Sequence, residues 1–157
     1  MKQKLVILGG GESGVGTAIL GQQKGYAVFV SDFGAIKDTY AQVLSSNQIN
    51  WEDKGHTVSE IIAADIVVKS PGIADVAPII CSLKQAGVKV ISEIEFAAQF
   101  TDATIVAITG SNGKTSTASL TYALLKDDLN VALGGNIGDS FAAQVASKDY
   151  KNFVLEL

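Results

Sequence analysis

Short apolar runs rich in β-branched residues alternate along this chain with longer stretches of helical period. The runs occupy residues 4–8, 27–31, 65–69, 88–92, 104–109, 131–133 and 152–157. The helical stretches lie between them, at residues 14–24, 76–86, 94–100, 114–126 and 140–147. Strands that alternate with helices build βαβ units, and short apolar strands are typically buried on both faces of a parallel sheet. The sequence therefore predicts an α/β fold with parallel sheets, and Gly25 and Gly87 stand where helix C-caps are expected.

Two glycine-containing loops of the phosphate-binding type each follow a predicted strand and precede a helix, at residues 9–14 and 109–115. Two such loops predict two nucleotide-handling domains. We predict a Rossmann-like domain at residues 1–92 and the first part of a P-loop ATPase α/β domain at residues 93–157. Residues 152–157 are predicted to form a buried strand, and a buried strand needs a further element of the protein to cover its sheet. We therefore expect the chain to be part of a longer protein.

Composition and the scarcity of reactive side chains argue against several functions. The 157 residues include 12 basic and 16 acidic side chains, for a net charge of -4, and no basic run could follow a nucleic-acid backbone. No apolar segment reaches the length of a signal peptide or membrane span, so we expect a cytoplasmic protein without membrane or nucleic-acid partners. The only cysteine, Cys81, and the only histidine, His56, cannot form a disulfide, a zinc site or a catalytic dyad. We interpret Cys81 as a small core residue and expect neither side chain to carry chemistry.

The first loop matches the dinucleotide-binding pattern G-x-G-x-x-G at Gly9, Gly11 and Gly14. Glycines allow a tight turn and a close approach of backbone N–H groups to a diphosphate. The helix predicted to begin at Gly14 presents the positive end of its dipole to the same place. Asp32, at the end of the next strand, could bind a ribose hydroxyl. The pattern predicts a nucleotide site, for which NAD is the usual ligand, and a glycine turn without a ligand is the alternative.

The second loop has the sequence T-G-S-N-G-K-T and opens a helix, as the phosphate-binding loops of NTPases do. It departs from the full G-x-x-x-x-G-K-[ST] pattern, because Ile108 stands at the first position. A lysine at a helix start is disfavoured by the dipole, so a phosphate facing Lys114 explains its presence best. We expect Lys114 to reach the β- and γ-phosphates of ATP and the Thr115 hydroxyl to bind Mg²⁺. The predicted ATP-binding residues are Gly110, Ser111, Asn112, Gly113, Lys114, Thr115 and Ser116.

Two further turns and one acid lie at the carboxyl ends of predicted strands, where open α/β sheets bind ligands. The turns are residues 70–73 and 134–138, and each alone is equally well explained as a plain turn. Glu156 lies among apolar residues at the position where NTPases keep a Mg²⁺-binding carboxylate. Burial of an acid is costly without such a partner, so we predict Glu156 as a metal ligand.

Taken in order, these segments resemble the Mur ligase family of bacterial cell-wall synthesis, and the T-G-S-N-G-K-T loop is distinctive of that family. The segments that carry the resemblance are residues 9–14, 70–73, 93–95, 107–115, 134–138 and 154–157. The S-P-G-I turn together with the E-I-E segment is most similar to the member that adds D-glutamate. Membership implies three domains: a Rossmann-like domain for the UDP-sugar, a central ATPase domain and a C-terminal domain for the amino acid. The chain would hold the first and the beginning of the second.

The resemblance implies a reaction in which ATP, with Mg²⁺, phosphorylates the carboxylate of UDP-N-acetylmuramoyl-L-alanine and D-glutamate attacks the acyl phosphate. Lys114 would be the catalytic residue, and Thr115 and Glu156 the metal ligands. A catalytic histidine, a modified lysine and the D-glutamate site would lie beyond residue 157, so we expect this chain alone to be inactive. The implied substrate-binding residues are Gly11, Glu12, Ser13, Gly14, Asp32, Phe33, Ser70, Pro71, Gly72, Ile73 and Asn136.

The resemblance leaves open how uracil is read, because Phe33 and Gly34 stand where a common form of the family has a polar or basic pair. Two rival functions also stay open. An NAD-dependent oxidoreductase would explain the first loop but leave the Lys114 loop without a purpose. A nucleotide-binding regulatory module without catalysis is the other. The preference of the chain for UDP, NAD or ATP would separate the three.

Overall fold

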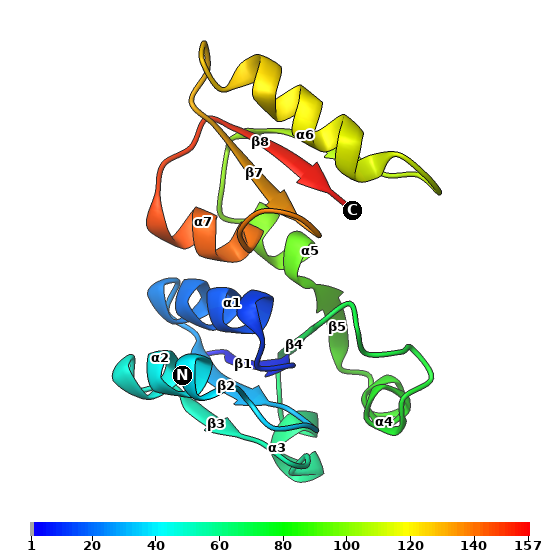
Figure 1. Cartoon of the computed structure of the whole chain (residues 1–157). Helices are drawn as coiled ribbons and strands as arrows, with labels where there is room; N and C mark the ends of the chain where they lie inside the picture. The colour runs from blue at the N-terminus through cyan, green and yellow to red at the C-terminus, as the bar shows by residue number, and fades with distance from the viewer. Residues whose placement is uncertain (1) are drawn as a thin grey trace.

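The computed structural model of the chain describes residues 2–157 and contains two β-sheets (Figure 1). The first sheet has the strand order β3-β2-β1-β4-β5, and the second has the order β6-β8-β7. Every pairing is parallel, which confirms the predicted α/β class. The strands are β1 (Lys4–Leu8), β2 (Ala27–Ser31), β3 (Asn50–Glu52), β4 (Ile66–Lys69), β5 (Lys89–Ser92), β6 (Thr104–Ile108), β7 (Val131–Gly135) and β8 (Asn152–Glu156).

In the described part of the chain, six helices connect parallel strands of one sheet as crossovers, and α5 connects the first sheet to the second. The helices are α1 (Glu12–Gln23), α2 (Asp38–Ser46), α3 (Val58–Ile62), α4 (Pro78–Gln85), α5 (Glu93–Ala98), α6 (Lys114–Leu125) and α7 (Phe141–Ser147). Within residues 2–157, none of these helices is long and apolar enough to cross a membrane. Strand β5 ends the first sheet at Ser92, and α5 begins at Glu93. The division into two domains at this point stays a prediction.

Alternation along β1 divides the core of the first sheet between its two faces. Leu5 and Ile7 belong to a cluster that also contains residues of α1 and α2. Val6 and Leu8 pack on the opposite face with residues of α3 and α4. All four side chains are at most 1% exposed, as expected for a parallel strand covered by helices on both sides.

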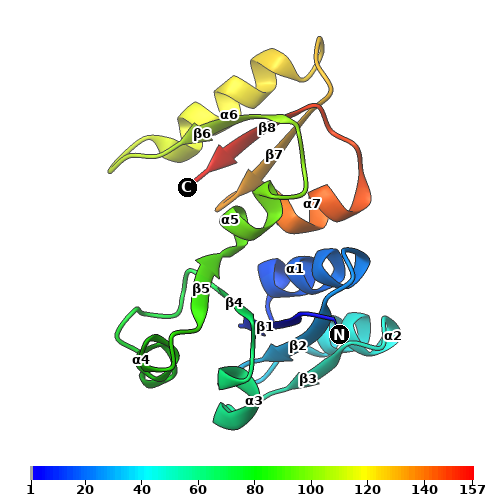
Figure 2. The ribbon, with the colours of Figure 1, turned by 180° about the vertical axis from the view of Figure 1, so that it is seen from behind.

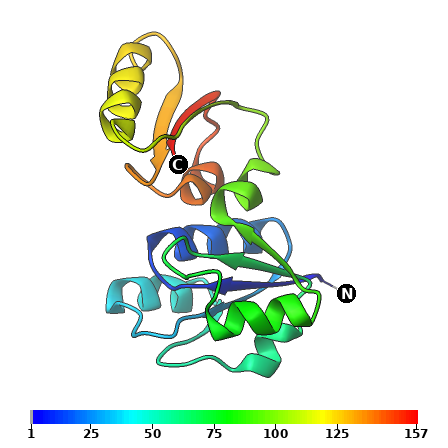
Figure 3. The ribbon, with the colours of Figure 1, turned by 90° about the vertical axis from the view of Figure 1, so that its right-hand side faces the viewer.

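Helices α1 and α7 lie side by side between the two sheets (Figures 1 and 3). The core cluster of α1 continues through α7 into the second sheet, where Phe141 and Phe153 are buried with ring centroids 4.8 Å apart. A side chain at Gly16 of α1 would overlap Ser140 and Ala143, so glycine is what lets the two helices approach so closely. Helix α6 covers the other face of the second sheet.

Strand β6 differs from the predicted strand, which we expected to be buried on both faces. It forms one edge of the second sheet, beside β8 (Figure 2), and its Ile105 and Val106 are 37% and 38% exposed. Leu120 and Leu124 of α6 are also exposed. Apolar composition alone did not distinguish this edge strand from a central one.

The prediction also missed three elements and misplaced the starts of four helices by one or two residues. Helix α2 buries only Leu44, β3 has three residues and α3 has five, so none carries a clear period. Helix α1 begins at Glu12 and not at Gly14, because Gly11 is its N-cap. The predicted C-cap glycines are confirmed, since both follow a helix and have positive φ.

The interpretation of Cys81 as a core residue is wrong. It is exposed on α4, and its thiol donates to the carbonyl of Val76 at 3.7 Å. Ile80 and Leu83 occupy the buried face of the helix. Cys81 lies one residue beyond Ile80, a rotation of about 100° that carries it away from the sheet.

Candidate functional site

The first glycine loop joins β1 to α1 with its backbone held tightly. Gly9 has a φ of +104°, and its N–H donates to the carbonyl of Ser31 at 2.9 Å. A side chain at Gly14 would overlap the carbonyl of Gly9. Nothing lies within 4 Å of the position that a side chain of Gly11 would take. The loop thus has no room for side chains beneath it and open space above the helix start, where backbone N–H groups can meet an anion.

Asp32 holds this loop in place. One carboxylate oxygen accepts from the N–H of Gly10 at 2.7 Å, and the other accepts from the N–H of Gly34 at 2.8 Å. The predicted contact of Asp32 with ribose or uracil would therefore have to share oxygens that already fix the backbone. In the structure, Asp32 joins the glycine loop to the turn after β2.

A first cavity of about 530 Å³ opens beside the loop. Six of the sequence-predicted residues or their loop neighbours line it: Gly9, Gly11, Asp32, Phe33, Ser70 and Ile73. The remaining lining residues, which the sequence analysis did not assign to a site, are His56, Ala74, Ala77, Pro78 and Ile79. The wall is mostly apolar, and Phe33 is 77% exposed there. The cavity has the size and apolar character of a small-molecule pocket.

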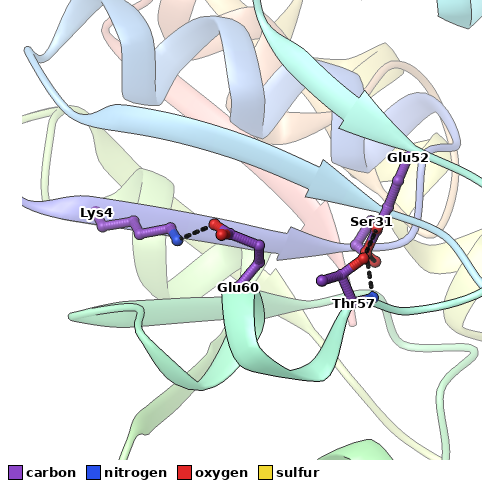
Figure 4. Close-up of polar contacts among 5 residues, drawn as sticks. All are labelled: Lys4, Ser31, Glu52, Thr57 and Glu60. Carbon is purple, nitrogen blue, oxygen red and sulfur yellow. Dashed lines mark hydrogen bonds and ion pairs between the residues drawn. The ribbon is translucent and has the colours of Figure 1, made fainter.

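A hydrogen-bonded network lies behind this cavity. The Ser31 hydroxyl is 2.6 Å from both the Glu52 carboxylate and Nδ1 of His56. Thr57 donates to the two Glu52 oxygens from its N–H at 2.8 Å and its hydroxyl at 2.6 Å (Figure 4). Partial burial opposes the charge of Glu52, but these hydrogen bonds and the nearby His56 outweigh it, so the pKa of Glu52 is lowered. Glu52 is thus an ionised carboxylate, which can accept hydrogen bonds but cannot donate them.

A second cavity of about 880 Å³ lies between the two sheets. Four sequence-predicted residues line it: Ser13 of α1, Pro71 after β4, Asn136 after β7 and Glu156 of β8. The first loop and the turn after β4 contribute residues to both cavities. The two cavities therefore share walls along the glycine loop.

Glu156 is the most unusual group in the second cavity. It is 6% exposed, and its Oε2 has no hydrogen-bond partner among residues 2–157. In the sheet it pairs with Ile108, directly before the Lys114 loop, and with Gly135, directly before Asn136. A side chain at Gly135 would overlap the Glu156 carbonyl. A buried carboxylate oxygen without a partner is costly and fits a cation.

The Lys114 loop lies outside both cavities. Lys114 Nζ donates to the carbonyl of Gly110 at 2.8 Å, within its own loop. Gly110 and Gly113 have φ values of +149° and +74°, so both use conformations that favour glycine. The residues around Lys114 are exposed at the start of α6: Ser111, Asn112, Gly113, Thr115 and Ser116. The structure therefore places most of the predicted substrate residues along the two cavities, whereas Lys114 lines neither.

Glu12 takes a role that its sequence position did not indicate. Its carboxylate accepts from the N–H of Ser140 at 3.2 Å, across 128 residues of sequence. The Ser140 hydroxyl donates to Glu93 at 2.7 Å, and the N–H of Ala142 donates to the same oxygen at 2.8 Å. Two carboxylates from the first loop and from α5 thus meet at the start of α7.

Gly72 has open space where a side chain would stand and lines neither cavity, although its neighbours do. Within residues 2–157, no cluster of three or more acidic, histidine or cysteine side chains could hold a metal ion. Any Mg²⁺ at Glu156 would therefore take further ligands from bound phosphates and water, which is common for this ion.

Comparison with known proteins shows which family of proteins the chain is similar to. Residues 4–79 match the family model described as the MurD N-terminal domain. The UDP-N-acetylmuramoylalanine–D-glutamate ligase of Christiangramia forsetii is 55% identical over all of this chain and 36% of its own length. The ligase of the same name from Bacteroides thetaiotaomicron is 54% identical over 99% of this chain and 35% of its own. The chain thus spans about a third of the length of these relatives.

Solved structures share the fold. A pseudomurein peptide ligase type C from Methanothermus fervidus superposes with a TM-score of 0.61 at 26% identity, over 99% of this chain and 33% of its own. The UDP-N-acetylmuramate:L-alanyl-gamma-D-glutamyl-meso-diaminopimelate ligase of Neisseria meningitides gives a TM-score of 0.63 at 19% identity, over 99% of this chain and 52% of that one. The family model over residues 4–79 and the relatives that match the whole chain are what identify it: the chain belongs to the Mur ligase family.

Proposed function

We propose that this chain forms the UDP-substrate-binding domain and part of the ATP-binding domain of a ligase that joins D-glutamate to UDP-N-acetylmuramoyl-L-alanine. The reaction would serve peptidoglycan synthesis and proceed through an acyl phosphate. Support for the substrate comes from the names of the relatives, which match the chain over its whole length. Because the chain spans about a third of those relatives, we expect the complete activity only in the longer protein.

The observation that carries this proposal is the pair of cavities that share the glycine loop as a wall. We place the uracil and ribose in the first cavity, the diphosphate over the start of α1, and the muramoyl group in the second cavity. The diphosphate would meet the backbone N–H groups around Gly11 and Ser13. Asn136 and Glu156 would then face the end of the substrate that reacts.

We assign ATP to the Lys114 loop and Mg²⁺ to Thr115 and Glu156. The fit rests on the buried Glu156 oxygen, which has no partner within residues 2–157, and on its pairing with Ile108 where the loop begins. When bound, Mg²⁺ would neutralise phosphate charge and polarise the phosphoryl group. Lys114 would add a fixed positive charge, after releasing the Gly110 carbonyl that it now contacts.

Ligand-dependent melting of this chain tests the first domain. UDP at 100 times its dissociation constant should add about 2.7 kcal/mol to the free energy of unfolding, if it binds only the folded chain. For a chain of this size the melting temperature should rise by roughly 5–10 °C. NAD at the same concentration is the matched control and should give no shift. Stabilisation by NAD and none by millimolar UDP would favour the oxidoreductase and refute the proposal.

A further inference from the structure

Of the sequence-predicted residues that line the first cavity, only Asp32 and Ser70 carry polar side chains. One carboxylate oxygen of Asp32 already accepts from the N–H of Gly10, and the other accepts from the N–H of Gly34. Phe33, the next residue, presents only an apolar ring, and Ile73 and its neighbours are apolar as well. Among the residues that line the first cavity, His56 is the one with a ring nitrogen that can form hydrogen bonds.

The network behind the cavity fixes which nitrogen of His56 carries the proton. Ser31 is fully buried and has one hydroxyl hydrogen, yet it lies 2.6 Å from both Glu52 and Nδ1 of His56. Glu52 is ionised, so it can only accept, and it takes the Ser31 hydrogen. The Ser31 oxygen must then accept from Nδ1 of His56. In the neutral ring, the hydrogen sits on Nδ1 and Nε2 keeps its lone pair.

That lone pair has no partner within the described chain. No hydrogen bond joins Nε2 of His56 to any of residues 2–157, whereas Nδ1 is held at the end of β2. The ring also lies next to Phe33, with centroids 5.7 Å apart and planes tilted by 49°. A hydrogen-bond acceptor beside an exposed aromatic ring is a suitable wall for a flat heterocycle that offers an N–H.

We propose that His56 is a specificity-determining residue that reads the base, its Nε2 accepting a hydrogen bond from the ring N–H at N3 of uracil while Phe33 covers one face. The inference rests on the proposed function, since it takes a uridine nucleotide as the ligand of the first cavity. It goes further in naming the group that recognises the base. Ser31 and Glu52 act as positioning residues, because they hold the ring in the tautomer that accepts.

The first test reads the tautomer directly. His56 is the only histidine of the chain, so a long-range ¹H–¹⁵N spectrum of the wild-type chain reports this ring alone. At about pH 8.5, above the range in which histidines ordinarily titrate, we expect the Nδ1–H pattern. Addition of UDP should shift the Nε2 signal. An Nε2–H pattern in the free chain, or a Nε2 signal unmoved by saturating UDP, would overturn the inference.

The second test compares UDP with its N3-methylated form by calorimetry. Methylation removes the N–H donor, so the wild-type chain should bind the methylated ligand at least about tenfold more weakly. His56→Ala should bind UDP about tenfold more weakly than wild type and should largely lose the difference between the two ligands. A purely structural role would weaken both ligands alike and keep their ratio, which would refute the base-reading role.

The two proposals fail in different ways. If the wild-type chain binds no uridine nucleotide, the proposed function of the first cavity is wrong. If it binds UDP but His56→Ala discriminates as the wild type does, only the role of His56 is wrong. Should His56→Ala not fold, the ring spectra of the wild-type chain with and without UDP still decide the question.

Discussion

Removal of the Glu93 carboxylate should destabilise the chain more than its position on a short helix would indicate. Glu93 is 7% exposed, and one of its oxygens accepts from both the Ser140 hydroxyl and the Ala142 N–H. Glu93→Ala would leave two buried donors without their acceptor, at about 1–3 kcal/mol each. Because the hydroxyl hydrogen of Ser140 can rotate whereas the Ala142 N–H is fixed, we expect a loss in the lower half of the summed range, about 3 kcal/mol in total.

Urea unfolding of the chain at pH 7 measures this loss, and the melting temperature should fall by roughly 6–12 °C. Glu93→Gln keeps an acceptor oxygen, so it should lower the free energy of unfolding by less than half as much as Glu93→Ala. Glu95→Gln is the matched control, since glutamine can also serve in the capping box that Glu95 forms with Ser92. Hydrogen exchange at the Ala142 amide should accelerate in Glu93→Ala. A loss under 1 kcal/mol, or unchanged exchange at Ala142, would refute the argument.

Three other predictions follow from the sites. Gly14→Ala should lower the free energy of unfolding by about 2 kcal/mol or more, because its methyl group would overlap the Gly9 carbonyl. Gly11→Ala should change it by less than about 1 kcal/mol, so equal melting temperatures of the two variants would contradict the prediction. The lowered pKa of Glu52 means that its stabilising effect is full above the ordinary glutamate pKa and is lost as pH falls through the lowered value. Glu52→Gln should therefore flatten the acid limb of a stability–pH curve, and an unchanged limb would argue against it. Lys114→Ala in the full-length ligase should raise the barrier of the ATP-dependent step by about 3 kcal/mol or more, while binding of the UDP-substrate persists. Wild-type turnover in this variant would rule out the assignment of Lys114 to ATP.

Much of the fold could be predicted from the sequence because long, regular elements carry their own signal. The seven predicted strands all correspond to strands of the structure, and the glycines after α1 and α4 were predicted from their positions after helical stretches. Helix α2 was missed because it buries only Leu44, whereas β3 and α3 were missed because they have only three and five residues. Their conformation depends on packing against the first sheet, which no local pattern reveals.

The same gap explains why His56 was set aside. Its loop reaches the first cavity because β3 pairs with β2, which brings Glu52 beside Ser31. Without β3 in the prediction, a lone histidine had no neighbours and was judged only as a metal ligand or catalyst. Cys81 is a different case, since the spacing of Ile80 and Leu83 on a helix was already visible in the sequence.

The contact between α1 and α7 makes the first sheet a poor candidate for separate expression. At this surface Gly16 lies directly against Ser140 and Ala143, and the buried rings of Phe141 and Phe153 belong to the same core as α1. A shortened protein that ended after β5 would present this surface to water and would be prone to self-association. Polar replacements on the outer side of α1 would be needed to keep such a protein monomeric. Conversely, a methyl group at Gly16 would act as a wedge, changing the angle between the sheets without altering a residue of either cavity.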